Sequence, residues 1–374
     1  MAPGSFPASK PPGVAQGVGR PPPNMVHIEM PTGGDDAKGV GISHSDASLS
    51  QDKSKEDTVK RPLSVTMGTW SLPRKGEDMW DTRECKVGGE KLFIALVADG
   101  HGGTDAALHC KRTVIENLIA AAGNDPSPDS LRAACKATFV RAHSEVLKML
   151  HTTAGTTLTV CIVNPLRCEL TTAHVGDSVA RMVPARGDAV ALCEDHRIDS
   201  SQVERDRLIG MGGKIARATD SFGQPAGPMR LWPGGVAQAR AIGDRDVGSF
   251  IDARPAVQTQ PISERGACIL VCSDGVWDAL IPTMVDAMVR TSRAVAPQAI
   301  ARLVCTSSLT QRHAYANSGD LVPRDDTTCI AISIARARER GTPRTSHITT
   351  TNLPRKRPIG CVPCIAQGAT DDEL

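Results

Sequence analysis

A short apolar run followed by an acidic, glycine-rich turn is the feature that most constrains this chain. Residues 92–97 read LFIALV, and DGHGG follows at 99–103. The run is too short to cross a membrane and suits a buried strand. The glycines let other backbone approach closely, and Asp99, the Gly100 carbonyl and His101 form a plausible hard-cation site beside a proton donor. Taken alone, the pentapeptide fits a tight strand-to-helix turn better.

The composition predicts an aliphatic core and gives no sign of binding driven by bulk charge. Apolar residues make up 40% of the 374 residues but aromatic residues only 3%, and the net charge is +2. We therefore expect no nucleic-acid partner. The cysteines lie mostly singly in apolar runs, which indicates buried free thiols in a reducing compartment. With no signal peptide or transmembrane run in the sequence, we expect a soluble, monomeric protein of the cytoplasm or nucleus.

The chain divides by composition into a central domain and two polar ends. Residues 1–60 are rich in Pro, Gly, Ser and charge and are expected to form a disordered arm. Residues 337–374 are expected to form a disordered tail. Its basic cluster at 355–357 and its pair Cys361 and Cys364 could serve nuclear targeting, palmitoylation or metal binding, but an unstructured tail is the preferred interpretation. The ordered domain spans 61–336.

Apolar periodicity in this domain predicts both strands and helices. The expected elements are strands over 63–67, 92–97, 157–163, 169–175, 267–272 and 327–334, and helices over 104–122, 129–149, 203–208, 282–289 and 297–309. Asp129 is available as the N-cap of the second helix. The short turn between the strands at 157–163 and 169–175 favours antiparallel pairing. Residues 194–235 are less regular and fit either a substrate-facing flap or a plain connection.

Acidic residues recur at the margins of the predicted strands. Asp78, Asp99, Asp274 and Asp325 each stand beside glycine or another acid. Carboxylates are costly to bring together unless a cation neutralises them. A set made only of oxygen ligands selects Mg²⁺ or Mn²⁺ over zinc. Two such ions that share a carboxylate can ionise a bridging water for attack on phosphorus, although spacing alone does not show that these strand ends meet.

A series of motifs resembles the metal-dependent serine/threonine protein phosphatases of type 2C over residues 63–335, in the order of that family. The motifs are RKGED (74–78), VADGHGG (97–103), AGTTLTV (154–160), HVGDS (174–178), EDHR (194–197), ERDRLIGMGG (204–213), ARAIGD (239–244), CSDGVWD (272–278) and RDDTTCI (324–330). The stretch GPMRLWPGG followed by ARAIGDRDVG resembles plant-type members. The resemblance implies an α+β fold, a β-sandwich of two antiparallel sheets flanked by helices in four layers (α-β-β-α). It also implies hydrolysis of phosphoserine and phosphothreonine in protein substrates.

The resemblance implies a centre of two Mg²⁺ or Mn²⁺ ions, both bound by Asp99. The other implied ligands are the Gly100 carbonyl and, through water, Glu77 or Asp78 for one ion, and Asp274 and Asp325 for the other. Asp177 and Asp278 match positions that form a weaker third site with Asp274 in some members.

The resemblance also assigns the proton donor and leaves the phosphate ligand open. His101 would protonate the leaving oxygen, a task that suits its ordinary pKa near 6.5. The family's phosphate-binding arginine lies one position farther from the acidic pair, so Arg74 or Lys75 could fill the role. The planar guanidinium favours Arg74. Because this first motif is altered, a phosphatase-like regulatory module with little or no activity is the alternative interpretation.

Overall fold

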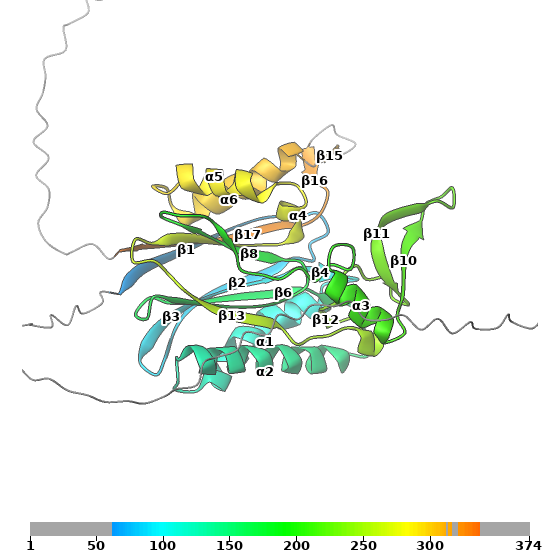
Figure 1. Ribbon diagram of the computed structural model, residues 1–374, viewed down its shortest axis with the longest axis horizontal. Coiled ribbons are helices and arrows are strands. Elements are labelled where there is room, and N and C mark those ends of the chain that lie inside the picture. Colours follow the sequence, from blue (N-terminus) through cyan, green and yellow to red (C-terminus); the bar gives the residue numbers. More distant parts are fainter. Residues whose placement is uncertain (1–61, 312, 316–320, 337–374) are drawn as a thin grey trace, which may run out of the picture. The chain divides into compact units, whose positions relative to one another are not determined.

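Two five-stranded sheets, packed face to face and covered by helices on their outer sides, make up most of the structure (Figure 1). It is a computed structural model that describes residues 62–311, 313–315 and 321–336. The two expected polar ends, including Cys361 and Cys364, lie outside these residues. The predicted α-β-β-α sandwich is confirmed, and every strand pair in the two sheets is antiparallel.

Each sheet mixes strands from distant parts of the chain. The first sheet has the order β1 (Leu63–Leu72), β17 (Thr327–Arg336), β14 (Ala267–Cys272), β8 (Val179–Pro184), β9 (Val190–Ala191). The second has the order β13 (Ala256–Pro261), β7 (Glu169–Val175), β6 (Leu158–Asn164), β3 (Glu90–Ala98), β2 (Met79–Val87). The expected antiparallel pair at 157–163 and 169–175 is β6 with β7.

The central strands are buried on both faces because alternate residues enter different cores. In β3, the even-numbered residues from 92 to 98 pack beneath α1 (Asp105–Ala122) and α2 (Pro128–Leu147). The odd-numbered residues from 93 to 97 pack between the sheets. In β14, the odd-numbered residues join that same inter-sheet core, and the even-numbered ones pack beneath α5 (Pro282–Thr291) and α6 (Pro297–Gln311). Continuous apolar runs therefore mark the middle of the sandwich.

The start of α2 differs from the expectation. Ser127 is the N-cap, and its Oγ accepts a hydrogen bond from the amide of Ser130 at 3.3 Å. Asp129, the predicted cap, lies instead in the first turn, where its negative charge favours the helix N-terminus. Pro128 at the first helical position explains the shift, because a proline there needs no amide partner.

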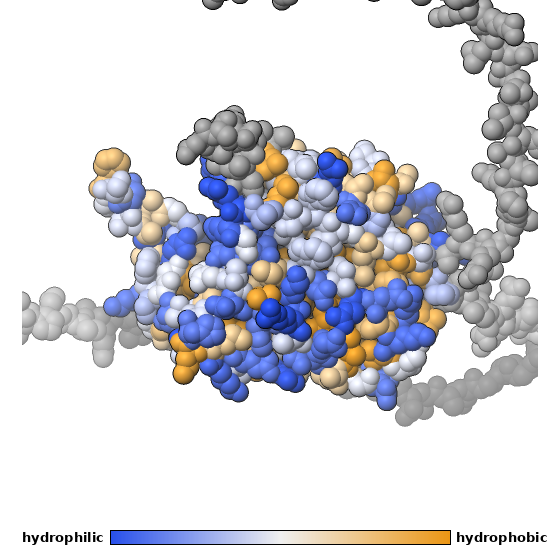
Figure 2. Space-filling model, turned by 180° about the vertical axis from the view of Figure 1, so that it is seen from behind, coloured by the Kyte–Doolittle hydropathy of each residue, from blue (hydrophilic) through white to orange (hydrophobic). Residues whose placement is uncertain are grey.

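The irregular segment 194–235 contains a helix and a projecting hairpin. Its elements are α3 (Gln202–Gly210), β10 (Lys214–Thr219) and β11 (Pro225–Trp232). A separate small core, which includes Ile198, Leu208 and Leu231, anchors its base. Figure 2 shows the hairpin standing clear of the body with apolar colour at its tip, where Phe222 is 86% exposed. We call this segment the flap.

Shorter elements complete the described residues. These are β4 (Gly100–His101), β5 (Gly155–Thr156) and β12 (Ile242–Gly243), which form one small sheet, the helical turns α4 (Asp274–Trp277) and η1 (Gly248–Phe250), and the pair β15 (His313–Tyr315) and β16 (Leu321–Pro323). None of the ten described cysteines forms a disulfide, and eight of them are buried. Within the described part of the chain, none of the helices combines the length and the apolar character that crossing a bilayer requires.

Candidate metal centre

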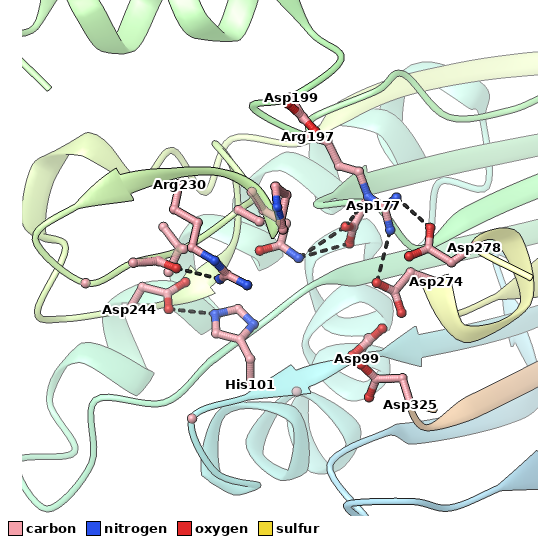
Figure 3. A pocket seen from close by; sticks show the side chains of 18 of the residues that line it. Asp99, His101, Asp177, Arg197, Asp199, Arg230, Asp244, Asp274, Asp278 and Asp325 are labelled. Carbon is pink, nitrogen blue, oxygen red and sulfur yellow. Dashed lines mark hydrogen bonds and ion pairs between the residues drawn. The ribbon is translucent and has the colours of Figure 1, made fainter. Parts of the chain in front are cut away.

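A cavity of about 740 Å³ lies where strand ends of both sheets meet the flap (Figure 3). Its walls are strongly acidic. The aspartates that line it are Asp99, Asp177, Asp199, Asp244, Asp246, Asp274, Asp278 and Asp325. Basic side chains also reach it, among them Lys75, Arg197 and Arg230. The acidic strand ends therefore do meet at one cavity, which the spacing in the sequence could not show.

Asp99 is held rigidly at the end of β3. Its amide donates to the Thr157 hydroxyl at 3.1 Å, and its carbonyl accepts from the Thr157 amide at 2.9 Å. The next position has no room for a side chain, because a Cβ on Gly100 would lie 2.7 Å from the carbonyl oxygen of Glu77. Burial, and then the charges of Asp78 and Asp274, raise the pKa of Asp99 well above its ordinary value.

Asp274 and Asp78 reach the same region from neighbouring segments. Asp274 opens α4 directly after β14, and burial together with Asp177 and Asp278 raises its pKa to about 8. Asp78 accepts a hydrogen bond from the Ser273 hydroxyl through Oδ2 at 2.8 Å, while its buried Oδ1 has no partner. Burial raises the pKa of Asp78 to about 6. Burial and the neighbouring acids thus favour the neutral forms of both carboxylates, although Asp274 also lies 3.0 Å from the guanidinium of Arg197.

The donor set fits a hard divalent cation. The groups are carboxylates and one backbone carbonyl, their mutual repulsion would be relieved by a cation, and Asp78 has an unused oxygen. Among the residues that the structure describes, no group of three or more His, Cys, Asp or Glu side chains is already arranged to hold a metal. The side chains must therefore draw inward to bind one.

Asp326 fixes the segment 74–78, although it was not singled out as a functional residue. Its two carboxylate oxygens accept hydrogen bonds from five successive backbone amides, those of residues 74 to 78, four of them at 2.5–3.1 Å. Burial favours the neutral form of Asp326, but these amides outweigh it and lower its pKa. The RKGED segment is therefore a fixed turn bound to the start of β17, whereas its composition alone had favoured a solvated loop.

Of the two candidates for phosphate binding, Lys75 is the one that lines the cavity. Its ammonium lies 2.9 Å from Asp325, and Arg74 is not among the lining residues. This placement favours Lys75 over Arg74. Glu77 has a local role in the structure, since its Oε1 accepts a hydrogen bond from the Gly103 amide at 2.8 Å and so braces the DGHGG turn.

His101 is oriented by Asp244, a buried residue that the sequence reasoning had given no role. Nε2 of His101 lies 2.6 Å from Oδ1 of Asp244. Burial alone would lower the pKa of His101, but the hydrogen bond and charge of Asp244 raise it. Gly155 makes room for this pair, because a Cβ there would overlap both carboxylate oxygens of Asp244. The GD pair at 243–244 repeats the GD at 176–177, which is the signal that could have identified it.

The three residues of the implied third site do come together, but around an arginine. The guanidinium of Arg197 lies within hydrogen-bonding distance of Asp177, Asp274 and Asp278 (Figure 3). In the sequence, Arg197 stands out only as the last residue of the EDHR motif. Its charge could not be assigned to these partners from sequence, because they are spread over about a hundred positions.

Comparison with known proteins gives one consistent relationship. Residues 82–315 match the family described as Protein phosphatase 2C. "Probable protein phosphatase 2C 40" of Oryza sativa subsp. japonica is 36% identical over 279 residues, covering 72% of this chain and 57% of that protein. "Probable protein phosphatase 2C 12" of Arabidopsis thaliana is 33% identical over 276 residues, covering 71% of this chain and 61% of that protein. The chain thus spans about three fifths of these relatives' length.

Solved structures with the same fold agree. The serine-threonine phosphatase 2C of Toxoplasma gondii aligns with a TM-score of 0.57 at 18% identity, over 73% of this chain and 97% of that one. A sex determining protein of C. elegans aligns with a TM-score of 0.58 at 21% identity, over 73% of this chain and 65% of that one. At such identities the likeness concerns the fold. Together with the match over residues 82–315 and the plant relatives, it shows that this chain belongs to the protein phosphatase 2C family, as a plant-type member.

Proposed function

We propose that this chain is a metal-dependent phosphatase that hydrolyses phosphoserine and phosphothreonine in proteins. The observation that carries the proposal is the meeting of Asp99, Asp274 and Asp325 with an oriented His101 in one cavity. Asp99, Asp274 and Asp325 would hold two ions together with the Gly100 carbonyl and with Asp78 or Glu77. Bound Mg²⁺ or Mn²⁺ would offset the mutual repulsion of these acids and would ionise a water for attack on phosphorus.

The chain's own residues would then handle the leaving group. Asp244 holds Nε2 of His101, and in Figure 3 the other ring nitrogen points toward the side of the cavity that contains Asp99. A protonated His101 can therefore donate from Nδ1 to the serine or threonine oxygen as its bond to phosphorus breaks. Because an alkoxide is a poor leaving group, this proton should matter most for phosphoserine and phosphothreonine.

Two basic side chains are suited to the phosphate. Lys75 lines the cavity next to Asp325, and Arg230 extends into it from β11, where its guanidinium donates to the Gly235 carbonyl at 2.6 Å (Figure 3). Arg230 comes from the flap, so a bound phosphopeptide would contact both the sandwich and the flap. The role of Arg74 in phosphate binding stays a prediction that this placement does not favour.

The alternative is a phosphatase-like binding module with little or no activity. It is motivated by the altered first motif, in which Lys75 forms an ion pair with Asp325, a residue proposed to bind metal. In such a module Lys75 would permanently replace part of the metal's charge. The two functions differ in whether divalent ions displace this pair.

Hydrolysis of a phosphothreonine peptide with Mn²⁺, with EDTA, and by the Asp99→Ala variant tests the proposal. We expect turnover by the wild type only with Mn²⁺, and loss of turnover in Asp99→Ala. Glu264→Ala, which removes an exposed carboxylate from the turn before β14, is the matched control and should keep full activity. Absent or metal-independent turnover by folded wild-type protein would refute the proposal, and absent turnover with the peptide still bound would support the alternative.

A further inference from the structure

The guanidinium of Arg197 contacts three carboxylates at once. Its Nε lies 2.6 Å from Asp177, one terminal nitrogen lies 2.6 Å from Asp278, and the other lies 3.0 Å from Asp274. Each nitrogen of the guanidinium thus donates to a different carboxylate. Figure 3 shows the guanidinium in contact with all three acids.

The backbone of Arg197 is fixed on both sides, so its side chain is not a loose surface group. The amide of Arg197 donates to Asp195 at 2.9 Å, and its carbonyl accepts from the Ser201 amide at 2.9 Å. The neighbours His196 and Ile198 are both buried. The segment also bridges to Gln238, and the Ile198 amide donates to the Ala237 carbonyl at 2.9 Å.

Gln238 is a second hydrogen-bond donor to the carboxylate of Asp177. The side-chain amide of Gln238 lies 3.3 Å from Oδ1 and 3.2 Å from Oδ2 of this carboxylate. Both oxygens of Asp177 therefore already accept hydrogen bonds from the protein. A metal ion that used them would have to break these contacts.

A guanidinium and a divalent ion cannot both occupy the position among Asp177, Asp274 and Asp278. Arginine stays charged at all accessible pH values, so it cannot yield by losing a proton. A divalent ion set among the same carboxylates would be repelled by the guanidinium, and would leave it partly buried without its partners. The residues at this position therefore do not suit a third ion as long as Arg197 is present.

We propose that Arg197 is a built-in cation that takes the place of a third metal ion among Asp177, Asp274 and Asp278. The proposal rests on the proposed function in that it assumes two ions at the neighbouring centre. Arg197 also lies at the base of the flap, whereas Asp274 and Asp278 lie at α4. The same side chain therefore ties the flap to the metal centre, and the chain needs only two ions.

Counting bound Mn²⁺ tests the proposal without measuring activity. Titration of the metal-free protein into the millimolar range, followed by calorimetry and by the electron paramagnetic resonance of free Mn²⁺, should give two ions per wild-type chain. Arg197→Ala should bind a third, weaker ion. Arg217→Ala is the matched control, because Arg217 is a flap arginine that pairs with Asp199 at 3.1 Å, and it should bind two ions.

The possible results separate this inference from the proposed function. Three ions in the wild type, or two in a folded Arg197→Ala, would overturn the role of Arg197 and leave the two-metal centre standing. No bound ion in the wild type would overturn the metal centre itself. The wild-type count remains decisive if Arg197→Ala fails to fold.

Discussion

Nε2 of His101 and Oδ1 of Asp244 lie 2.6 Å apart although 143 positions separate them in the chain. Asp244 is 2% exposed and has a left-handed backbone conformation with φ of 56°, which non-glycine residues adopt rarely. An aspartate held in this way can keep one imidazole nitrogen engaged and leave the other for the substrate. The pair sets the orientation of the proposed proton donor.

We expect Asp244→Asn to lower kcat for a phosphothreonine peptide about 10- to 100-fold with little change in KM, because the imidazole loses its charged partner. Steady-state kinetics checks this. The loss should be much smaller with an aryl phosphate, whose leaving group needs no proton, and His101→Gln should show the same contrast. An equal loss on both substrates would argue against proton donation by His101.

Gly155→Ala should impair the same step without touching a charged group. The added methyl would overlap both oxygens of Asp244 and push this carboxylate away from His101. We expect a fall in kcat of the same order as that of Asp244→Asn. Gly210→Ala is a suitable comparison, because Gly210, like Gly155, has no left-handed backbone conformation, and the space around its Cβ position is open. Unchanged kcat in Gly155→Ala would contradict the proposed tight fit.

Asp326→Ala should destabilise the protein by about 2–4 kcal/mol, because five backbone amides lose a charged acceptor at once. Urea unfolding in EDTA measures this. Asp325→Asn is the neighbouring control, which should retain stability in EDTA but bind metal weakly. If both variants unfold at the wild-type urea concentration, Asp326 does not hold the 74–78 turn.

Asp99→Asn should be inactive but more stable than the wild type when metal is absent. The carboxylate of Asp99 faces several other acids, and a neutral amide removes that repulsion. We expect a gain of about 1–2 kcal/mol in EDTA, seen as a higher melting temperature, and no further gain on adding Mg²⁺. Lower stability in EDTA would mean that repulsion is not the dominant interaction of this side chain.

The stacked pair His174 and His196 should make the fold sensitive to acid. Burial lowers the pKa of His174 to about 3 and that of His196 to about 4, and Nε2 of His174 accepts from the Glu194 amide at 3.0 Å. Between pH 6.5 and 4 the unfolded chain binds protons that the folded chain excludes, so stability falls as the pH falls. Each histidine contributes a slope of up to about 1.4 kcal/mol per pH unit.

His174→Gln isolates this effect from the titration of the carboxylates. Glutamine can accept the same hydrogen bond but does not ionise, so unfolding free energy should fall less steeply with acid than in the wild type. Denaturant unfolding at a series of pH values gives both slopes. Identical slopes would show that the histidine pair does not control acid stability.

The sequence predicted the fold best where the local pattern of apolar residues determines whether a segment is buried. The apolar runs of β3 and β14 identified the buried strands, and the acids that follow them, Asp99 and Asp274, line one cavity. The predicted N-cap of α2, Asp129, was wrong by two residues, because Pro128 occupies the first helical position and Ser127 is the N-cap.

What could not be predicted depends on contacts between distant segments. Neither Asp326, which binds a turn about 250 positions earlier, nor Arg197, whose acidic partners lie on two other segments, stands out by composition. The strands β2 and β8 were also missed, because charged residues interrupt their apolar patterns. In β8 this residue is Arg181, which pairs with Asp286 of α5. Only the folded arrangement gives such residues their roles.

The position of β17 has a consequence for biosynthesis. This strand lies between β1 and β14, and Asp326 at its start shapes the turn that carries Lys75 and Asp78. A nascent polypeptide still lacking these residues has neither the strand that joins β1 to β14 nor the part of the cavity that Asp325 lines. The proposed metal centre can therefore assemble only after residues 325–336 have been synthesised.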